Sequence, residues 1–185
     1  MRRNIVITGF MGTGKSIVAK ELARKLGMKF IDMDRIIEER QGTSIADIFA
    51  RYGEKYFRAQ ENKLVKELSQ KVNMVIATGG GTLLSSDNAR ILGQAGEIVC
   101  LYADSQTIYN RVKRKNDRPL LKGENILNKI NLLLEERKKI YDNIKWKINT
   151  TNFTTQEVAD KIINLLKLER WVGEGEGDYS KNYGR

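Results

Sequence analysis

The sequence predicts an α/β fold in which a five-stranded parallel sheet carries helices on both faces. Short apolar runs rich in β-branched residues alternate along the chain with longer segments whose apolar residues recur at helical spacing. A glycine-rich stretch, residues 9–16, stands between the first such run and the first helical segment. The 185 residues contain no internal repeat and no interdomain linker. We therefore expect one domain over residues 1–170 and a flexible polar tail over residues 171–185.

The first element is a buried strand over residues 4–8, followed by the sequence Gly-Phe-Met-Gly-Thr-Gly-Lys-Ser of residues 9–16. These eight positions fit the pattern G-x-x-x-x-G-K-[ST], and a helix is predicted from about Lys15 to Leu26. The glycines let successive backbone N–H groups point into one concavity, and the helix N-terminus adds its positive dipole end. Lys15 can then reach the β- and γ-phosphates, and the Ser16 hydroxyl can bind Mg²⁺. An ordinary glycine-rich turn is the alternative, which both flanking elements disfavour. The stretch predicts binding of a nucleoside triphosphate.

A second strand over residues 28–31 leads into Asp32-Met33-Asp34. Residues two apart on a strand point the same way, so Asp32 and Asp34 would project together from its carboxyl end. In an open parallel sheet, ligands bind at that end. The alternative is a solvated acidic turn in which Asp34 caps a helix that begins at Arg35.

Three helical segments follow, the last two on either side of Gly53. Residues 35–40 form a short helix stopped by Gly42, and Ser44 caps the next helix, which resumes after Gly53 and runs to Leu68. Arg58 has Glu61 three residues on, close enough to hold its guanidinium in place. An exposed surface ion pair is the alternative for these two residues.

A third strand over residues 74–77 runs into three consecutive glycines, Gly79, Gly80 and Gly81. Such a run is costly in chain entropy, so it is expected where backbone approaches a ligand that a Cβ would exclude. A simple tight turn is the alternative. Further along we expect helices over 85–92, 106–113, 126–141 and from Thr154 or Thr155 to 168, and strands over 97–102 and 145–149.

Residues 111–122 are strongly basic, with six Lys or Arg residues, one acid and the only proline of the chain, Pro119. A stretch of this composition between a strand and a later helix suits a lid that closes over phosphates, because closure keeps water from taking the γ-phosphate.

The composition narrows the chemistry further. The formal net charge is +10, which fits a nucleic-acid surface or a site for several anionic groups. Histidine is absent, so proton transfer must use carboxylates or the substrate itself. Cys100 is expected to be a small buried apolar residue. No apolar run approaches the roughly 18 residues of a membrane span, and no targeting segment is evident, so we expect a cytoplasmic protein.

Taken together and in order, these motifs resemble one family closely, shikimate kinase, of the nucleoside-monophosphate-kinase-like P-loop group. The resemblance covers about residues 4–167. The matching segments are GFMGTGKS at 9–16, DMD at 32–34, GTSI at 42–45, Gly53-Glu54 with Phe57-Arg58 and Glu61, GGG at 79–81, RPLL at 118–121, and Arg137 with Tyr141. The family often has a proline between that arginine and tyrosine, whereas this chain has Lys138-Lys139-Ile140.

The resemblance implies transfer of the ATP γ-phosphate to the 3-hydroxyl of shikimate, toward the aromatic amino acids. It implies a substrate-binding segment over about residues 33–61 and a lid over about 112–125. Lys15, Asp34 and Arg118 would be catalytic, with Asp34 orienting or deprotonating the attacking hydroxyl. One Mg²⁺ ion would be held by Ser16 and, through water, by Asp32.

The resemblance also assigns the two binding sites. The expected ATP-binding residues are Gly12, Thr13, Gly14, Lys15, Ser16, Ile17, Arg111, Arg118 and Asn152. The expected shikimate-binding residues are Asp34, Arg58, Gly79, Gly80, Gly81 and Arg137. Phe49 and Phe57 are candidates for the pocket wall, with core packing as the alternative.

Two other functions share some of these sequence features. A gluconate kinase of the same group would lack this ordered set of acidic pair, arginines and glycines. A nucleic-acid-binding ATPase module would explain the positive charge, but aromatic residues are not interleaved with the basic run as stacking platforms would be. We therefore expect ATP and shikimate as partners, a monomer, and neither nucleic acid nor membrane.

Overall fold

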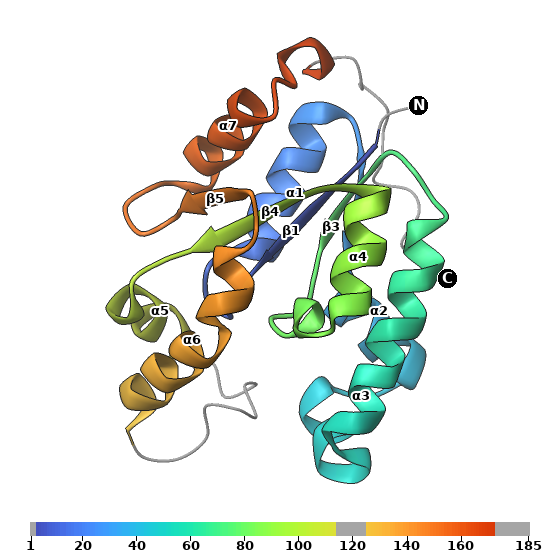
Figure 1. The fold of residues 1–185 in the computed structure, drawn as a ribbon, viewed down its shortest axis with the longest axis vertical. Helices are drawn as coiled ribbons and strands as arrows, with labels where there is room; N and C mark the ends of the chain where they lie inside the picture. The colour runs from blue at the N-terminus through green and yellow to red at the C-terminus, as the bar shows by residue number, and fades with distance from the viewer. Residues whose placement is uncertain (1–2, 114–124, 173–185) are drawn as a thin grey trace.

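A computed structural model describes residues 3–113 and 125–172 of the chain. Within these residues five parallel strands form one sheet, as the sequence predicts, and the structure gives their order as β2-β3-β1-β4-β5. The strands are β1 (Asn4–Gly9), β2 (Lys29–Asp32), β3 (Met74–Ala77), β4 (Gly96–Tyr102) and β5 (Trp146–Asn149). Figure 1 shows the sheet with helices packed around it.

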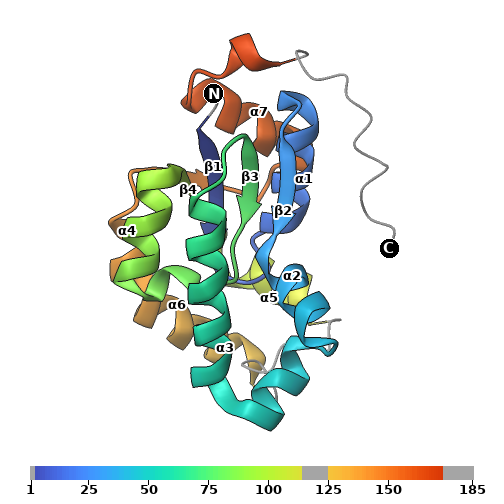
Figure 2. The same cartoon turned by 90° about the vertical axis from the view of Figure 1, so that its right-hand side faces the viewer.

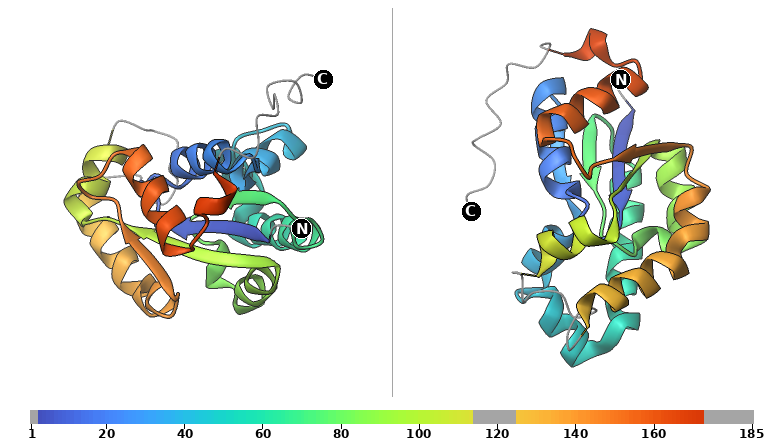
Figure 3. Two further views of the ribbon diagram at one scale, coloured as in Figure 1. Left: turned by 90° about the horizontal axis from the view of Figure 1, so that it is seen from above. Right: turned by 90° about the vertical axis from the view of Figure 1, so that its left-hand side faces the viewer.

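Alternation along β1 divides the core into two layers. Ile5 and Ile7 face the layer that contains α1 (Lys15–Leu26) and α7 (Thr155–Leu165). Val6 faces the opposite layer, which contains α2 (Met33–Gln41), α3 (Ile45–Ser69) and α4 (Ser86–Ala95). Every residue of β1 is buried, as expected of a central strand with helices on both sides. Figure 2 and Figure 3 show the two helical layers on either side of the sheet.

A third apolar cluster lies beyond the carboxyl end of β1. Phe10 and Met11 of the glycine-rich loop pack there with α5 (Ser105–Val112) and α6 (Ile126–Asp142). Helix α2 and the start of α3 lie at the same end of the sheet, as Figure 2 shows. The cluster thus fixes the glycine-rich loop against α5 and α6.

The helices follow the predicted boundaries with small differences. The two segments expected on either side of Gly53 form one element, α3, and Gly53 interrupts its helical geometry with φ 79° and ψ 172°. The last helix ends at Leu165 rather than at 168, and a 3₁₀ turn, η3 (Glu169–Trp171), follows it. Trp171, assigned to the tail by sequence, packs against the α1–α7 layer. Helix α6 is continuous through Lys138 and Lys139, where the family often has proline.

Two further features agree with expectation. Cys100 is buried in β4, and this burial raises the pKa of its thiol to about 12, so the side chain behaves as a small apolar group. Among the residues that the structure describes, no helix combines the length and apolarity that crossing a membrane requires.

Candidate active site

The phosphate loop, residues 9–16, has the backbone geometry that its glycines predict. Gly9, Gly12 and Gly14 all have positive φ values, of 135°, 79° and 91°. At Gly9 a Cβ would lie 2.1 Å from the carbonyl oxygen of Leu101 on the neighbouring strand. A side chain at Gly9 is therefore excluded both by backbone conformation and by close packing.

The start of α1 is open to an anion. Gly14 occupies the N-cap position and provides no side-chain cap, and the first turn holds no acidic residue. The N–H groups and the dipole of this helix end are thus directed into the loop. The Lys15 ammonium donates to the carbonyl oxygen of Phe10 at 3.1 Å, which folds this side chain back over the loop. Thr13 is buried and donates to the same carbonyl at 2.8 Å, so it stabilises the loop from within.

The acidic pair converges at the site, but for a different reason from the one its spacing suggests. Strand β2 ends at Asp32, and Asp34 lies in the first turn of α2. Asp32 is the N-cap, accepting a hydrogen bond from the Arg35 N–H at 3.3 Å, so the alternative in which Asp34 caps a helix starting at Arg35 is wrong. The short side chain of Asp32 satisfies an exposed helix N–H, and the helix therefore begins two residues earlier.

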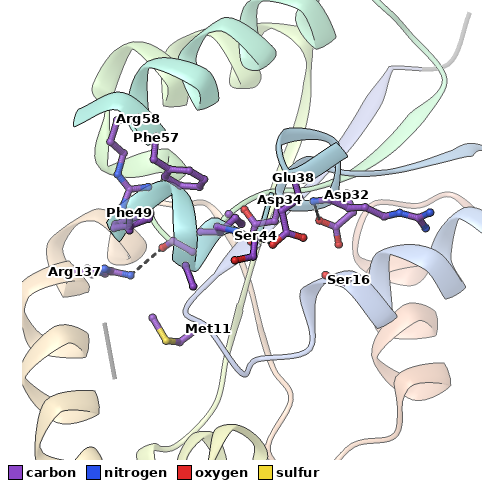
Figure 4. Close-up of a pocket in the computed structure, with 16 residues that line it drawn as sticks. Met11, Ser16, Asp32, Asp34, Glu38, Ser44, Phe49, Phe57, Arg58 and Arg137 are labelled. Atoms are coloured by element: carbon purple, nitrogen blue, oxygen red, sulfur yellow. Dashed lines mark hydrogen bonds between the residues drawn. The ribbon is translucent and has the colours of Figure 1, made fainter. Parts of the chain in front are cut away.

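A pocket of about 610 Å³ lies between this helix start, α3, α6 and the phosphate loop. Its lining includes Ser16, Asp32, Asp34, Phe49, Phe57, Arg58, Gly79, Gly80, Gly81 and Arg137. In Figure 4 the guanidinium groups of Arg58 and Arg137 lie toward one end of this main pocket, and the two aspartates with Ser16 lie toward the other. The tertiary structure thus brings all the predicted substrate and metal residues to one pocket, with Ser16 of the phosphate loop at one end.

Arg58 is held by two carboxylates of its own helix. Its Nη1 donates to Glu61 Oε2 at 2.5 Å and its Nη2 donates to Glu54 Oε1 at 2.8 Å. Burial acts to lower the pKa of Arg58, but the charges and hydrogen bonds of Glu61 and Glu54 outweigh it and raise the pKa above its usual value. The Glu61 side chain is only 1% exposed, so the alternative of an exposed surface ion pair is wrong.

Arg137 is nearly buried, at 5% exposure, and its Nη1 donates to the carbonyl oxygen of Gly80 at 3.1 Å. No carboxylate lies within ion-pair distance of it among residues 3–113 and 125–172. Tyr141, one helical turn on, donates to the same carbonyl at 2.8 Å. Burial raises the pKa of Tyr141 to about 12, so its hydroxyl keeps the proton that this hydrogen bond requires. Among the described residues, the partners of this buried cation include a carbonyl oxygen and the ring of Phe10, 5.4 Å away, and such a cation is suited to bind an anion.

Two of the three glycines, Gly79 and Gly81, leave room for charged side chains of the pocket wall. At Gly79 a Cβ would lie 2.6 Å from Glu61 Oε1 and 2.7 Å from Asp34 Oδ1. At Gly81 it would lie 2.6 Å from Arg58 Nη2, whereas at Gly80 its nearest neighbour would be 3.5 Å away, an ordinary contact. None of the three has a positive φ. The close approach is therefore to the protein's own charged side chains, which the glycines allow to enter the pocket wall.

Hydrogen bonds of Arg111 and Thr150 connect the segments that are predicted to bind the nucleotide. Arg111 Nη2 donates to the Thr150 carbonyl at 2.7 Å, and its Nη1 donates to the Gly12 carbonyl at 3.3 Å. A small cavity of about 100 Å³ beside them is lined by Ile17 and Phe153, among others. Asn152 is exposed in the turn after β5 and is not one of the lining residues. Thr150, which sequence identified only as part of a turn, is buried and donates to the Thr13 carbonyl at 3.1 Å.

The predicted lid and the predicted metal ligands are the remaining parts of the site. Arg118 and most of the predicted lid lie outside the residues that the structure describes. No group of three or more Asp, Glu, Cys or His side chains suited to a metal occurs in the described ranges. Ser16 and Asp32 both face the main pocket, and such a sparse oxygen set fits Mg²⁺, which usually keeps waters and binds substrate phosphates.

Comparison with known proteins identifies one family. A family model described as shikimate kinase matches residues 11–167. A shikimate kinase of Pelotomaculum thermopropionicum is 42% identical over 170 residues, covering 92% of this chain and 99% of that protein. One of Thermodesulfovibrio yellowstonii is 44% identical over 161 residues, covering 87% and 93%. The solved structure of shikimate kinase from Acinetobacter baumannii in complex with shikimate matches with a TM-score of 0.87 at 36% identity, covering 91% and 94%.

The fold is also found in more distant kinases. A gluconokinase from Sinorhizobium meliloti matches with a TM-score of 0.58 at 16% identity, covering 92% of this chain and 96% of that chain. At that identity only the fold is shared. The expected P-loop kinase fold is confirmed, and the choice among phosphate acceptors depends on the residues of the main pocket.

Proposed function

The chain belongs to the shikimate kinase family, and on that basis we propose that it transfers the γ-phosphate of ATP to the 3-hydroxyl of shikimate. The products are shikimate 3-phosphate and ADP, in the pathway toward the aromatic amino acids. The observation that carries the proposal is the main pocket, with two guanidinium groups at one end and two aspartates at the other. Shikimate has matching chemistry, since it carries one carboxylate and three hydroxyls.

The carboxylate of shikimate binds to Arg58 and Arg137. Guanidinium groups suit carboxylates because their N–H donors match the two oxygens. Arg137 supplies a buried positive charge without a carboxylate partner among the described residues, and Arg58 supplies a guanidinium already oriented by Glu61 and Glu54. The Gly79–81 segment lies against the ring, and Phe49 and Phe57, whose rings are 5.0 Å apart, form part of the wall.

The attacking hydroxyl is oriented by Asp34. Helix α2 places this carboxylate in the pocket that Ser16 of the phosphate loop also lines, so it lies between the acceptor and the phosphates. Asp34 accepts a hydrogen bond from the 3-hydroxyl and can take up its proton as the bond to phosphorus forms. No histidine exists in the chain to do this instead.

The triphosphate binds in the phosphate loop. The loop N–H groups, the open start of α1 and Lys15 neutralise charge on the β- and γ-phosphates, and we propose that Arg118 adds to this from the lid. Mg²⁺, held by Ser16 directly and by Asp32 through water, would offset charge on the phosphates. Ile17, Arg111 and the turn after β5 face the nucleotide base. We further propose a cytoplasmic monomer.

A coupled assay of ADP release tests this function, with Mg-ATP and matched concentrations of shikimate, gluconate and nucleoside monophosphates. Turnover with shikimate alone is the expected result. Turnover with gluconate instead would show that the protein is a kinase, but it would contradict the proposal that Arg58 and Arg137 bind the carboxylate of shikimate. Absence of turnover with every acceptor would contradict the proposal, and binding to RNA or DNA at two salt concentrations would then test the nucleic-acid alternative.

A further inference from the structure

Thr82 lies just behind the main pocket and does not line it. It begins the short 3₁₀ turn η1 (Thr82–Leu84) directly after Gly81, and its side chain is 1% exposed. Its hydroxyl donates to Glu61 Oε1 at 2.5 Å and lies 3.2 Å from the carbonyl oxygen of Gly79. A hydroxyl has one proton to donate, and the carboxylate is the stronger and nearer acceptor. The Thr82 proton therefore belongs to Glu61.

This hydrogen bond provides the second oxygen of the buried Glu61 carboxylate with a donor. Glu61 Oε2 accepts from Arg58 and Glu61 Oε1 accepts from Thr82, so both oxygens have donors. Glu61 is fully buried, and a buried carboxylate oxygen that loses its donor is costly because water cannot replace it. Without the hydroxyl, the carboxylate would reorient to share the remaining donors, and Arg58 would move with it.

The space around Glu61 Oε1 leaves little freedom. A Cβ built at Gly79 would lie within 3.1 Å of three oxygens, Glu61 Oε1, Asp34 Oδ1 and Thr82 Oγ1. Two carboxylates therefore flank the same backbone position, and the Thr82 hydroxyl provides a donor beside them. Its hydrogen bond offsets the negative charge of Glu61 on the side that faces Asp34.

Thr82 is itself held in place from α4. The side-chain amide of Asn88 donates to the Thr82 carbonyl oxygen at 3.0 Å, and Asn88 is 3% exposed. The Thr82 N–H points back to the Gly79 carbonyl at 3.4 Å. The position of the hydroxyl is thus fixed by a buried network that reaches from α4 to α3.

We propose that Thr82 is a positioning residue for the acceptor: its hydroxyl fixes the Glu61 carboxylate, which in turn holds the Arg58 guanidinium toward the carboxylate of shikimate. This inference rests on the proposed function. It adds a residue that touches neither substrate and acts through two others. Its signature is a change in shikimate affinity without a change in ATP affinity.

The test compares Thr82→Val, which keeps the shape but removes the hydroxyl, with Thr82→Ser, which keeps the hydroxyl. We expect Thr82→Val to raise KM for shikimate by about 5- to 50-fold, the usual range for a buried charged acceptor that loses its donor. KM for ATP and kcat should stay within about twofold, because the phosphate loop is untouched. Thr82→Ser should keep KM for shikimate within about threefold of the original enzyme.

A matched control separates this role from general loss of a buried hydroxyl. Thr78 is 3% exposed, and its hydroxyl donates to Thr8 Oγ1 at 3.1 Å, away from Glu61. Thr78→Val should lower thermal stability without raising KM for shikimate. In an Arg58→Ala background, adding Thr82→Val should change KM by less than about twofold, because the effect passes through that arginine.

Unchanged KM for shikimate in Thr82→Val, with the unsubstituted enzyme active on shikimate, would overturn this inference and leave the proposed function intact. Equal increases in both KM values, or a full additional loss in the Arg58→Ala background, would also overturn it. Failure of the unsubstituted enzyme to use shikimate would instead overturn the proposed function. If Thr82→Val does not fold, Thr82→Ala and Thr82→Ser give the same comparison.

Discussion

The two ends of the candidate active site differ in how far apart their residues lie in the chain. The phosphate end takes the loop of residues 9–16 and the start of α1, which are continuous in sequence. The acceptor end takes Asp34 from α2, Arg58 from α3, the glycines at 79–81, and Arg137 from α6. Residues that span about a hundred positions meet there only because the helices pack around one end of the sheet.

This difference has a physical consequence. The phosphate end is specified by backbone conformation, since positive φ values at three glycines and an uncapped helix start create the anion site. The acceptor end is specified by buried side-chain contacts, among them Arg58 with Glu61 and Arg137 with Gly80. Substitutions at the first end that spare the glycines, such as Lys15→Ala, should therefore alter catalysis with little loss of stability. Those at the second end should couple binding to stability.

The largest expected effect is at Lys15. Lys15→Ala should lower kcat by about 10²- to 10⁴-fold, because a charge that offsets the transferred phosphoryl group is lost. KM for shikimate and the melting temperature should change little. Steady-state kinetics and a thermal melt measure this, with exposed Lys20 on the same helix as the matched control through Lys20→Ala. A Lys15→Ala enzyme with near-normal kcat would remove the lysine from catalysis.

The next largest effect is expected at Asp34, the residue that α2 contributes to the acceptor end. Asp34→Asn should lower kcat by about 10²- to 10³-fold, because the amide cannot accept the hydroxyl proton. Asp87→Asn is the control, since Asp87 is an exposed acid in the first turn of α4. Circular dichroism should show both variants folded. Full activity of Asp34→Asn would mean that the hydroxyl of shikimate loses its proton without this base.

Arg58 tests whether binding and stability are coupled at the acceptor end. Arg58→Ala should raise KM for shikimate by about 10- to 100-fold and cost about 1–3 kcal/mol of folding free energy, because buried Glu61 loses its charged donor. Adding Glu61→Gln should recover part of the stability and none of the shikimate affinity. Denaturant titration and steady-state kinetics measure the two effects.

The control for Arg58 is Arg40→Ala. Arg40 also bridges to α3, through Glu67 at 2.7 Å, but both side chains are well exposed. Its loss should cost less than about 1 kcal/mol and leave both KM values unchanged. An equal loss of ATP and shikimate affinity in Arg58→Ala would indicate a folding defect and contradict the binding role.

The smallest expected effect is at Gly81. Gly81→Ala should raise KM for shikimate by about 3- to 10-fold, because the new methyl group displaces the guanidinium end of the Arg58 side chain rather than backbone. Gly93→Ala in α4 is the control, since a Cβ there meets only Ile98 Cδ1 at 3.8 Å. It should raise stability by about 0.5–1 kcal/mol with unchanged kinetics. Equal kinetics for the two variants would contradict the steric account of residue 81.

Much of the fold follows from the sequence because its signals are local. Each strand is a short apolar run, and the caps at Ser44 and Thr154 are where the residue types predict them. The start of α2 shows the limit of such signals, because its cap is Asp32 and not Asp34. Asp32 and Asp34 are both good N-cap residues two positions apart, and only the end of strand β2 decides between them.

The sequence by itself determined the phosphate loop, the parallel sheet, the family and the residue types of the acceptor site. Only the tertiary structure decided that Glu61 is buried, that Gly79 and Gly81 accommodate charged side chains, and that Thr82 and Thr150 belong to the networks behind the site. The reason is physical. Backbone conformation is encoded by neighbours along the chain, whereas burial and hydrogen-bond partners depend on segments that meet only when the helices pack onto the sheet.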